Sequence, residues 1–296
     1  MMKPDDLLNV IREKCNLPDD CRMLPLEAGN SLASNYLIAN RGEPVFFAKI
    51  HDEDNGKRFA AARYLFGQNI PMPEPLAEFD AGDGKVCTLT RWISAEPILP
   101  TEKNAKKGAQ IIRALHSVEV PPEYPSGNLS AEVQYYLSYF EKADNCPVRF
   151  EDIAGVLRQP APQSPQCSFT HLDVHMRNFV QNGQKLFLID FENLTVSDPW
   201  RDLVYAAFFH NRDENEFWAA FLWEFFRGEP PESFWSTMKY YCYVHLLRMM
   251  MCEHKKGNAD MLRYLSESVL TNFPATARLP SWMEQRKERK RKTVPL

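Results

Sequence analysis

The stretch His-Leu-Asp-Val-His-Met-Arg-Asn, residues 171 to 178, decides the expected fold, together with Leu-Ile-Asp-Phe at residues 188 to 191. The first stretch has the pattern H-x-D-x-x-x-x-N, in which Asp173 precedes Asn178 by five positions. Asp190 comes twelve positions after Asn178, at the end of an apolar segment that begins after an Asn-Gly turn. We expect this segment to be a strand that delivers Asp190 beside the loop of residues 171 to 178.

These three side chains are the groups that phosphoryl transfer from a nucleotide requires. A carboxylate such as Asp173 can accept the proton of an attacking hydroxyl. Amide and carboxylate oxygens, as in Asn178 and Asp190, are the hard ligands that Mg²⁺ prefers when it neutralises phosphate charge. A lone H-x-D triplet means little, so the prediction depends on the complete set and on its spacing.

With Asp-Pro-Trp-Arg-Asp-Leu at residues 198 to 203, the chain resembles the aminoglycoside phosphotransferase and choline kinase superfamily. The sequence around Asp173 is nearest to thiamine kinase-like members. The resemblance is specific from residue 171 to 203 and extends weakly from about residue 24 to 254. It implies an α+β, two-lobed protein-kinase-like fold with a small β-rich N-lobe and a larger helical C-lobe.

The resemblance also implies a role for each residue of the motif. Asp173 would be the catalytic base, and Asn178 and Asp190 would be the metal ligands. The implied cofactors are ATP and Mg²⁺, and the enzyme would be a small-molecule kinase that phosphorylates an alcohol group. Three further residues would be structural, bracing the loop, tying its backbone or capping the next helix: His171, Asp198 and Asp202. For His175, a surface role and a functional role both stay open.

The N-terminal part carries the residues predicted to bind the nucleotide. Lys49 lies inside the apolar strand expected at residues 44 to 50, and the resemblance makes it the lysine that pairs with the α- and β-phosphates. The other predicted contacts come from the backbone of a turn with a single glycine and from the hinge between the lobes: Gly29, Asn30, Ser31, Leu89 and Arg91.

One departure from the family pattern concerns the glutamate that orients this lysine in kinases. Its expected position on the following helix falls near Arg58, where the chain reads Arg-Phe-Ala-Ala-Ala. A loop carboxylate could replace it, and the sequence offers Asp52, Glu53 and Asp54. If none does, the chain could be a nucleotide-binding, pseudokinase-like module without turnover.

Periodicity predicts the organisation of the chain. Residues 1–93 should form the nucleotide-clamping lobe, residues 94–280 a helical lobe with the catalytic loop and substrate pocket, and residues 281–296 a basic tail. In the first lobe we expect strands, a short amphipathic helix through Leu7, Leu8 and Ile11 capped by Asp5 or Asp6, and another helix at 57–68. In the second we expect helices at 102–118, 130–143, 202–210, 214–227, 232–252 and 261–271.

Composition sets limits on the class of protein. The 296 residues are 44% hydrophobic and 25% charged, with a net charge of −4, so we expect no nucleic-acid partner. The seven cysteines are scattered without a C-x-x-C pair, which predicts neither a zinc site nor a disulfide framework and favours the cytoplasm. We expect no signal peptide and no membrane span. The oligomeric state stays open.

The acceptor is the least determined part of the prediction. The helices between residues 202 and 252 are rich in aromatic residues with acidic residues among them, which would suit a cation such as choline, thiamine or an aminoglycoside. A helical core with a solvated face would give the same composition. A protein-substrate kinase is a second possibility, although only eleven residues separate Asp190 from Asp202.

Overall fold

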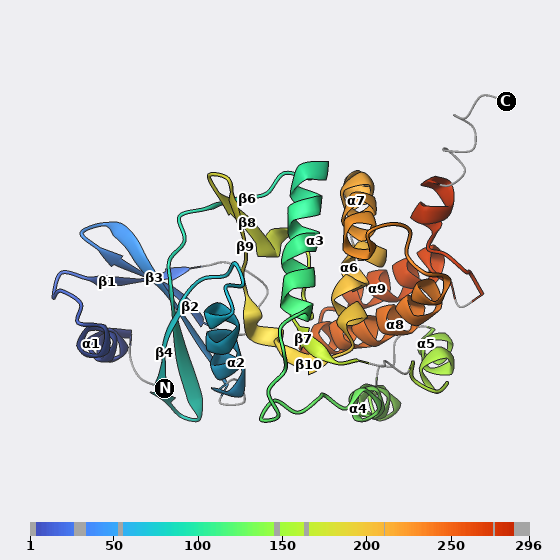
Figure 1. The fold of residues 1–296 in the computed structure, drawn as a ribbon. Helices are drawn as coiled ribbons and strands as arrows, with labels where there is room; N and C mark the ends of the chain where they lie inside the picture. The colour runs from blue at the N-terminus through green and yellow to red at the C-terminus, as the bar shows by residue number, and fades with distance from the viewer. Residues whose placement is uncertain are drawn as a thin grey trace. The chain divides into compact units, whose positions relative to one another are not determined.

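The computed structural model describes residues 4–26, 34–52, 56–144, 149–162, 166–209, 211–274 and 276–286. The chain forms two compact units, whose elements are labelled in Figure 1. The first unit consists of Met1–Ile98 and Met176–Leu194, and the second of Leu99–His175 and Thr195–Leu296. The chain therefore enters each unit twice. The functional lobes and the tail expected from the sequence stay a prediction.

A five-stranded antiparallel sheet makes up most of the first unit, in the order β1-β2-β3-β5-β4. Its strands are β1 (Arg22–Leu26), β2 (Ser34–Asn40), β3 (Glu43–Asp52), β4 (Pro75–Gly82) and β5 (Lys85–Arg91). Helix α1 (Pro4–Cys15) packs on it through Leu7 and Ile11, and α2 (Gly56–Gly67) follows β3. The expected β-rich start, with a short helix at its beginning and one helix in its middle, is confirmed.

Strand β3 places Lys49 on the side of the sheet opposite its apolar core. Ala48 and Ile50 belong to the core cluster shared with Leu7 and Ile11. Because side chains alternate along a strand, Lys49 between them points to the other face. Even so, only 8% of its surface is exposed. A lysine that is buried without being in the core requires charged partners.

A second, three-stranded sheet brings residues 176–194 into the first unit. It consists of β6 (Glu96–Pro97), β8 (Phe179–Asn182) and β9 (Lys185–Leu188), with a short 3-10 turn, η2 (Met176–Asn178), before β8 and another, η3 (Phe191–Asn193), after β9. Asn182 pairs with Lys185 across the hairpin, and Gly183 has a φ of 56°, which glycine adopts without strain. The predicted Asn-Gly hairpin is confirmed.

The second unit is mostly helical. Its helices are α3 (Glu102–His116), α4 (Leu129–Glu141), α5 (Phe150–Leu157), α6 (Val204–Ala207), α7 (Asn215–Phe226), α8 (Glu232–Lys255) and α9 (Ala259–Asn272). Figure 1 shows α3 and α7 side by side, and α8 contacts α4, α5 and α9. The short strands β7 (Ser168–Thr170) and β10 (Thr195–Ser197) pair antiparallel. The predicted α+β class with a β-rich first part and a helical second part is confirmed.

Two helices differ from the expectation. The helix predicted at 202–210 is a 3-10 turn, η4 (Pro199–Leu203), followed by the single α-helical turn α6, because Asp198 caps a start at Pro199. Helix α5 was not predicted. Its N-cap, Arg149, has a φ of 72° and provides no side-chain cap, so the sequence lacks the usual start signal.

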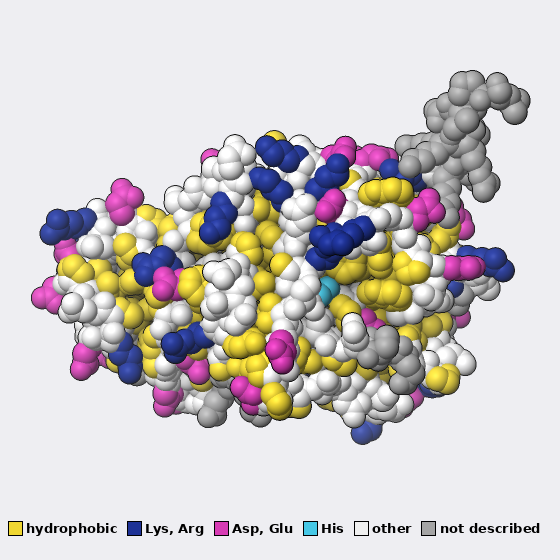
Figure 2. Space-filling view, viewed as in Figure 1, with side chains coloured by type: hydrophobic (Ala, Val, Ile, Leu, Met, Phe, Trp, Pro, Cys, Tyr) yellow, Lys and Arg dark blue, Asp and Glu magenta, His cyan; other side chains and the backbone are white. Residues whose placement is uncertain are grey.

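Charged side chains of both signs are scattered over the face of the molecule drawn in Figure 2. Among the described residues, no helix is both long enough and apolar enough to span a bilayer.

Candidate active site

The ammonium group of Lys49 lies between two carboxylates of the first unit. Lys49 Nζ is 2.9 Å from Asp190 Oδ1 and 2.5 Å from Glu192 Oε2. Burial by itself lowers the pKa of Lys49, but the two carboxylates outweigh that effect, so its pKa lies above the ordinary value. Lys49 therefore carries its positive charge in a sheltered place, where an anionic ligand would feel it strongly.

A sharp turn after β9 presents both carboxylates to Lys49. Asp190 has a left-handed backbone, with φ 67° and ψ 62°, and η3 follows at once. The N–H of Leu194 donates to the carbonyl of Phe191 at 3.1 Å and closes the turn. Because the chain reverses at Asp190, the side chains of Asp190 and Glu192 both reach the same ammonium group.

Helix α2 offers Lys49 no carboxylate, and Glu192 pairs with Lys49 instead. Helix α2 contains no acidic residue, and Nη1 of Arg58 instead donates to the backbone carbonyl of Glu192 at 2.7 Å. Three loop carboxylates were considered from the sequence as substitutes for this glutamate. Glu53, Asp54 and the side chain of Asp52 all lie outside the described residues. Glu192 was missed as the lysine's partner, although the acidic position after Asp-Phe in the motif was the signal that could have found it.

The hairpin β8–β9 brings the two predicted metal ligands to one end of the same element. The N–H of Ile189 donates to the carbonyl of Asn178 at 2.9 Å, directly beyond the pair formed by Phe179 and Leu188. Asn178 is buried at the end of η2, and Asp190 follows Ile189. Sequence reasoning placed these residues beside each other for the same reason, a strand that returns behind an Asn-Gly turn.

The donor set at this end of the hairpin fits Mg²⁺ held jointly with a nucleotide. Asn178 offers an amide oxygen and Asp190 a carboxylate whose side chain is 35% exposed. Mg²⁺ typically takes one or two carboxylates and completes its shell with phosphate and water oxygens. In the part of the chain that the structure describes, no three His, Cys, Asp or Glu side chains gather into a metal-binding group. Asn178 and Asp190 would hold the ion together with the phosphates.

The structure describes only two of the other residues that were predicted to contact the nucleotide. Gly29, Asn30 and Ser31 lie outside the described residues. Leu89 is buried in β5, between β3 and β4. The backbone N–H of Arg91 donates to the carbonyl of Glu74 at 2.9 Å, and its guanidinium lies 2.6 Å from the Glu74 carboxylate. Adenine binding at residues 89–91 stays a prediction, and any such contact would have to use groups other than this N–H.

In the second unit, a buried carboxylate holds the loop that carries Asp173. Asp202 accepts the backbone N–H of His171 at 3.0 Å and that of Leu172 at 2.6 Å. Nε2 of His116 donates to it as well, at 2.8 Å. Leu172 has a φ of 59°, unusual for a non-glycine residue, so these bonds hold a strained turn just before Asp173. The predicted role of Asp202 in tying the loop backbone is confirmed.

Asp198 has the structural role that was predicted for it. Its Oδ1 accepts the N–H of Trp200 at 2.8 Å and caps η4, while its Oδ2 accepts the hydroxyl of Tyr241 at 2.7 Å. The residue therefore joins the start of η4 to helix α8.

The carboxylate of Asp173 lies among hydrogen-bonding groups. His175 Nε2 is 3.5 Å from Asp173 Oδ2, and the hydroxyl of Tyr205 also bonds to this carboxylate. Burial raises the pKa of Asp173, but the hydrogen bond and charge of His175 lower it further than burial raises it. The net pKa lies well below the ordinary value, so Asp173 is ionised at neutral pH. His175 thus contacts the predicted base.

Three rings pack around this carboxylate, and two of them were not predicted from the sequence. The ring of Tyr205 lies 5.1 Å from that of His175 and 5.1 Å from that of His245, edge to face in both cases. Burial, reinforced by the charge of Arg248, lowers the pKa of His245 to about 3, so its ring is neutral at neutral pH. Tyr205 and His245 come from α6 and α8, and no local motif marks them.

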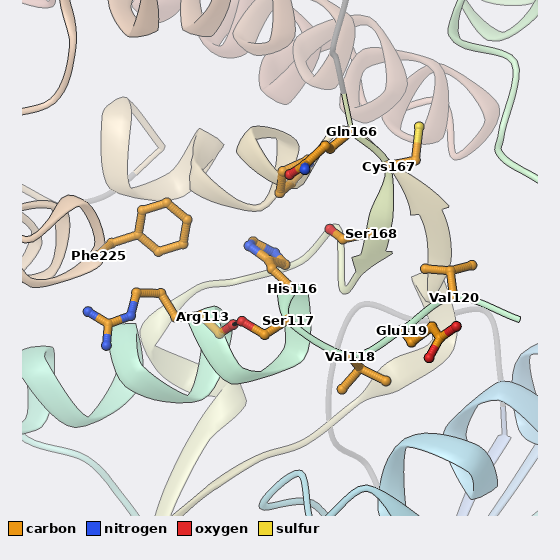
Figure 3. A pocket seen from close by; sticks show the side chains of 11 residues that line it. Arg113, His116, Ser117, Val118, Glu119, Val120, Gln166, Cys167, Ser168 and Phe225 are labelled. Atoms are coloured by element: carbon orange, nitrogen blue, oxygen red, sulfur yellow. Dashed lines mark hydrogen bonds between the residues drawn. The ribbon is translucent and has the colours of Figure 1, made fainter.

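A pocket of the second unit lies beside His116. Figure 3 shows the side chains that line it, from the end of α3, from β7 and its lead-in, and from Phe225 on α7. Its volume is about 620 Å³. His116 both lines this pocket and donates to Asp202, so the pocket lies beside the carboxylate that holds the loop of Asp173.

Three of the acidic residues considered as attractors of a cation have other partners. Glu192 pairs with Lys49, Glu214 accepts the indole N–H of Trp218, and Glu224 accepts the amide of Gln110 at 3.0 Å. Several of the aromatic residues counted with them are buried in the core: Trp218, Trp235, Tyr240, Tyr241 and Tyr243. A cationic acceptor therefore stays a prediction.

Comparison with solved structures places the fold. An aminoglycoside kinase solved with GDP and kanamycin aligns with a TM-score of 0.67 and 16% identity, covering 90% of this chain and 99% of that one. A choline kinase from Streptococcus pneumoniae gives 0.64 and 16%, again covering 90% and 99%. A spectinomycin phosphotransferase solved with ADP and spectinomycin gives 0.63 and 14%, covering 98% and 94%. At these identities the likeness shows the fold alone. No curated protein matches the chain.

A family model described as the phosphotransferase enzyme family matches residues 24–235, well over half of the chain. The match spans the lysine strand, the loop of Asp173 and the hairpin that ends at Asp190. The predicted resemblance and the prediction of a small-molecule kinase are confirmed at the level of family and fold. The chain belongs to the phosphotransferase enzyme family.

Proposed function

We propose that this protein is an ATP- and Mg²⁺-dependent kinase that transfers the γ-phosphate to a hydroxyl group of a small molecule. The observation that carries the proposal is the ion pair between Lys49 and Asp190, which joins residues 141 positions apart at 2.9 Å. In kinases of this type, the strand lysine binds phosphates and the aspartate binds the metal, so the two must lie together.

Three residues of the first unit bind the nucleotide and its metal in this proposal. Lys49 binds the α- and β-phosphates through its ammonium group. Asn178 and Asp190 hold Mg²⁺, which neutralises phosphate charge when it is bound. Asp190 pairs with Lys49, so the two groups that we propose to share the nucleotide lie close together. This arrangement lowers the reorganisation needed on binding.

Asp173 acts on the acceptor. Its carboxylate accepts the hydroxyl proton as the hydroxyl oxygen bonds to the γ-phosphorus and the bond from that phosphorus to the β-phosphate oxygen breaks, which leaves ADP. Because its pKa is low, Asp173 is ready to accept a hydrogen bond from the hydroxyl at any physiological pH. Its contribution is orientation of the hydroxyl more than strong basicity, as suits a transition state with little nucleophilic bond formation.

The acceptor that we propose is a small cationic alcohol of the aminoglycoside, choline or thiamine type. The similar structures solved with kanamycin or spectinomycin, and the choline kinase among them, support this class as the first to test. A protein-substrate kinase is the second candidate. The pseudokinase-like alternative rested on the missing helix glutamate, and the Lys49–Glu192 pair removes that reason.

The test is ADP release from Mg-ATP against a panel of choline, thiamine, aminoglycosides, macrolides and ketosamine sugars. We expect one acceptor to be turned over and Asp173→Asn to lower that turnover by about 10² to 10⁴-fold, because the proton then has no acceptor. Binding of Mg-ATP should be preserved in the variant. An unchanged rate would exclude Asp173 as the base, and Mg-ATP binding without turnover on any acceptor or lysate protein would favour the binding module.

A further inference from the structure

We propose that Glu192 orients Lys49 for nucleotide binding and so replaces the carboxylate that kinases place on the helix after the lysine strand. The inference rests on the proposed function, since it assigns a task to Lys49 that only a nucleotide phosphotransferase needs. In protein kinases the ion pair between this lysine and a helix glutamate must be in place for activity. Glu192 is a positioning residue in this sense, acting through Lys49.

The geometry of the ion pairs favours Glu192 over Asp190 as the lasting partner of Lys49. Glu192 Oε2 is the closer of the two oxygens, at 2.5 Å against 2.9 Å for Asp190 Oδ1. Asp190 is also the predicted metal ligand, so its carboxylate has a second task. The side chain of Glu192 is 29% exposed and that of Lys49 10%, so the pair is sheltered enough to hold one geometry.

Helix α2 shows a matching change of charge. It has no acidic residue along Gly56–Gly67, and Arg58 stands near the position expected for the glutamate. Nη1 of Arg58 donates to the backbone carbonyl of Glu192 at 2.7 Å. The helix therefore holds the turn that carries the carboxylate instead of carrying the carboxylate itself. Arg58 therefore links the two changes, the loss of an acidic residue on the helix and the carboxylate of Glu192 on the turn.

The turn explains how one short segment can serve both tasks. Asp190 adopts a left-handed conformation, and residues 191–193 form a 3-10 turn. Residues 190 and 192 therefore project toward the same side, where Lys49 lies. A straight strand would also place them on one face, but their parallel side chains would stand about 7 Å apart along the strand.

The experiment uses Glu192→Gln, which keeps the shape of the side chain and removes its charge. The matched control is Glu253→Gln, because Glu253 also pairs with a lysine, Lys256, at 2.8 Å, and belongs to the second unit. The readouts are the dissociation constant of ATP in EDTA, the ATP KM and kcat on the accepted substrate, and the Mg²⁺ concentration for half-maximal rate. Circular dichroism checks that each variant folds.

We expect Glu192→Gln to weaken ATP binding in EDTA by about tenfold and to lower kcat/KM by about 10 to 10²-fold, because Lys49 is no longer held in place. The Mg²⁺ requirement should not change. Glu192→Asp, which keeps the charge, should recover part of the loss, and Glu253→Gln should behave like the wild type.

Three results would overturn the inference. Tighter ATP binding in Glu192→Gln would show that Glu192 only repels the phosphates. A raised Mg²⁺ requirement with unchanged ATP binding in EDTA would make it a metal ligand. A variant equal to the wild type in every readout would leave Lys49 oriented by other groups. A wild-type protein that binds no ATP would instead reject the proposed function itself, and this inference with it.

Discussion

Two turns of the molecule present an aspartate from a left-handed backbone, and they are held by different means. Before Asp173, Leu172 has a φ of 59°, and the carboxylate of Asp202 accepts the N–H groups of His171 and Leu172. At the other turn, Asp190 itself has a φ of 67°, and its side chain pairs with Lys49 while Arg58 holds the carbonyl of Glu192. The first turn is held by buried bonds to the backbone, the second by charged side chains.

The difference matches what each aspartate must do. In the proposed function Asp173 keeps one position. The carboxylate of Asp202, which is 1% exposed and accepts three hydrogen bonds, fixes the backbone beside it. In the proposed function Asp190 would exchange its partner when a nucleotide binds, and an ion pair to a lysine is an interaction that phosphate and metal can replace. Both turns keep a strained backbone beside an aspartate. Only the ion pair of Asp190 is a support that a bound ligand could replace.

Asp202→Asn tests the permanent support and should have the largest effect on stability. The amide replaces one acceptor oxygen with a donor that faces N–H groups, so at least one buried bond is lost and a repulsive contact is formed. We expect the free energy of unfolding to fall by about 3 kcal/mol. Urea unfolding followed by circular dichroism measures it.

The control for this substitution is Asp152→Asn, because Asp152 has a similar carboxylate in an exposed pair with Arg149. Its loss should be below about 0.5 kcal/mol. If Asp202→Asn costs no more than this control, the buried bonds do not hold the turn and the contrast between the two supports is lost.

His245 sharpens the contrast, because it is a buried neutral ring beside the turn of Asp173. Its folded pKa of about 3 lies below the unfolded value, so between these two values the unfolded state binds one more proton. The free energy of unfolding should therefore decrease as pH falls, by about 1.4 kcal/mol per pH unit from this group. His245→Leu should make the slope between about pH 4.5 and 6 shallower by that amount. Parallel curves for the two proteins would mean that His245 titrates normally in the fold.

Leu172→Gly should have the smallest effect. Glycine removes the strain of the left-handed conformation, but it also gains freedom in the unfolded chain and loses a half-buried side chain. These contributions nearly cancel, and we expect a change within about 1 kcal/mol. Val174→Gly, two positions on, has no such strain to relieve and is 1% exposed, so it should cost about 2 to 3 kcal/mol. Equal losses at both positions would show that Leu172 carries no strain.

The sequence predicted those parts of the site that depend on local pattern. The hairpin signal and the alternation along β3 placed Asp190 and Lys49 correctly within their elements, because turn chemistry and strand period act over a few residues. Asp202 was identified through a motif and has the expected contacts with the loop backbone. Gly29, Asn30 and Ser31 stay predictions.

The partners that come from distant segments could not be predicted in the same way. Tyr205 bonds to Asp173 from α6, and His245 packs against Tyr205 from α8, so these contacts depend on how the two helices pack. The acidic position after Asp-Phe was a signal for Glu192, but its pairing with Lys49 depends on the left-handed turn at Asp190, a conformation that aspartate adopts only occasionally. The acidic residues considered for a cation site show a further limit, since composition does not say which charges are already paired.

The reversed charge at Arg58 has a consequence for control of the enzyme. Where the lysine's partner sits on a helix, displacing that helix switches the enzyme off, and many kinases are regulated in this way. Here the partner lies two residues from the predicted metal ligand, on the same turn, so the lysine and the metal ligand are assembled or lost together. If Glu192 positions Lys49 as proposed, the lysine would have no off position separate from that of the metal ligand, and we expect turnover to follow the supply of acceptor and nucleotide.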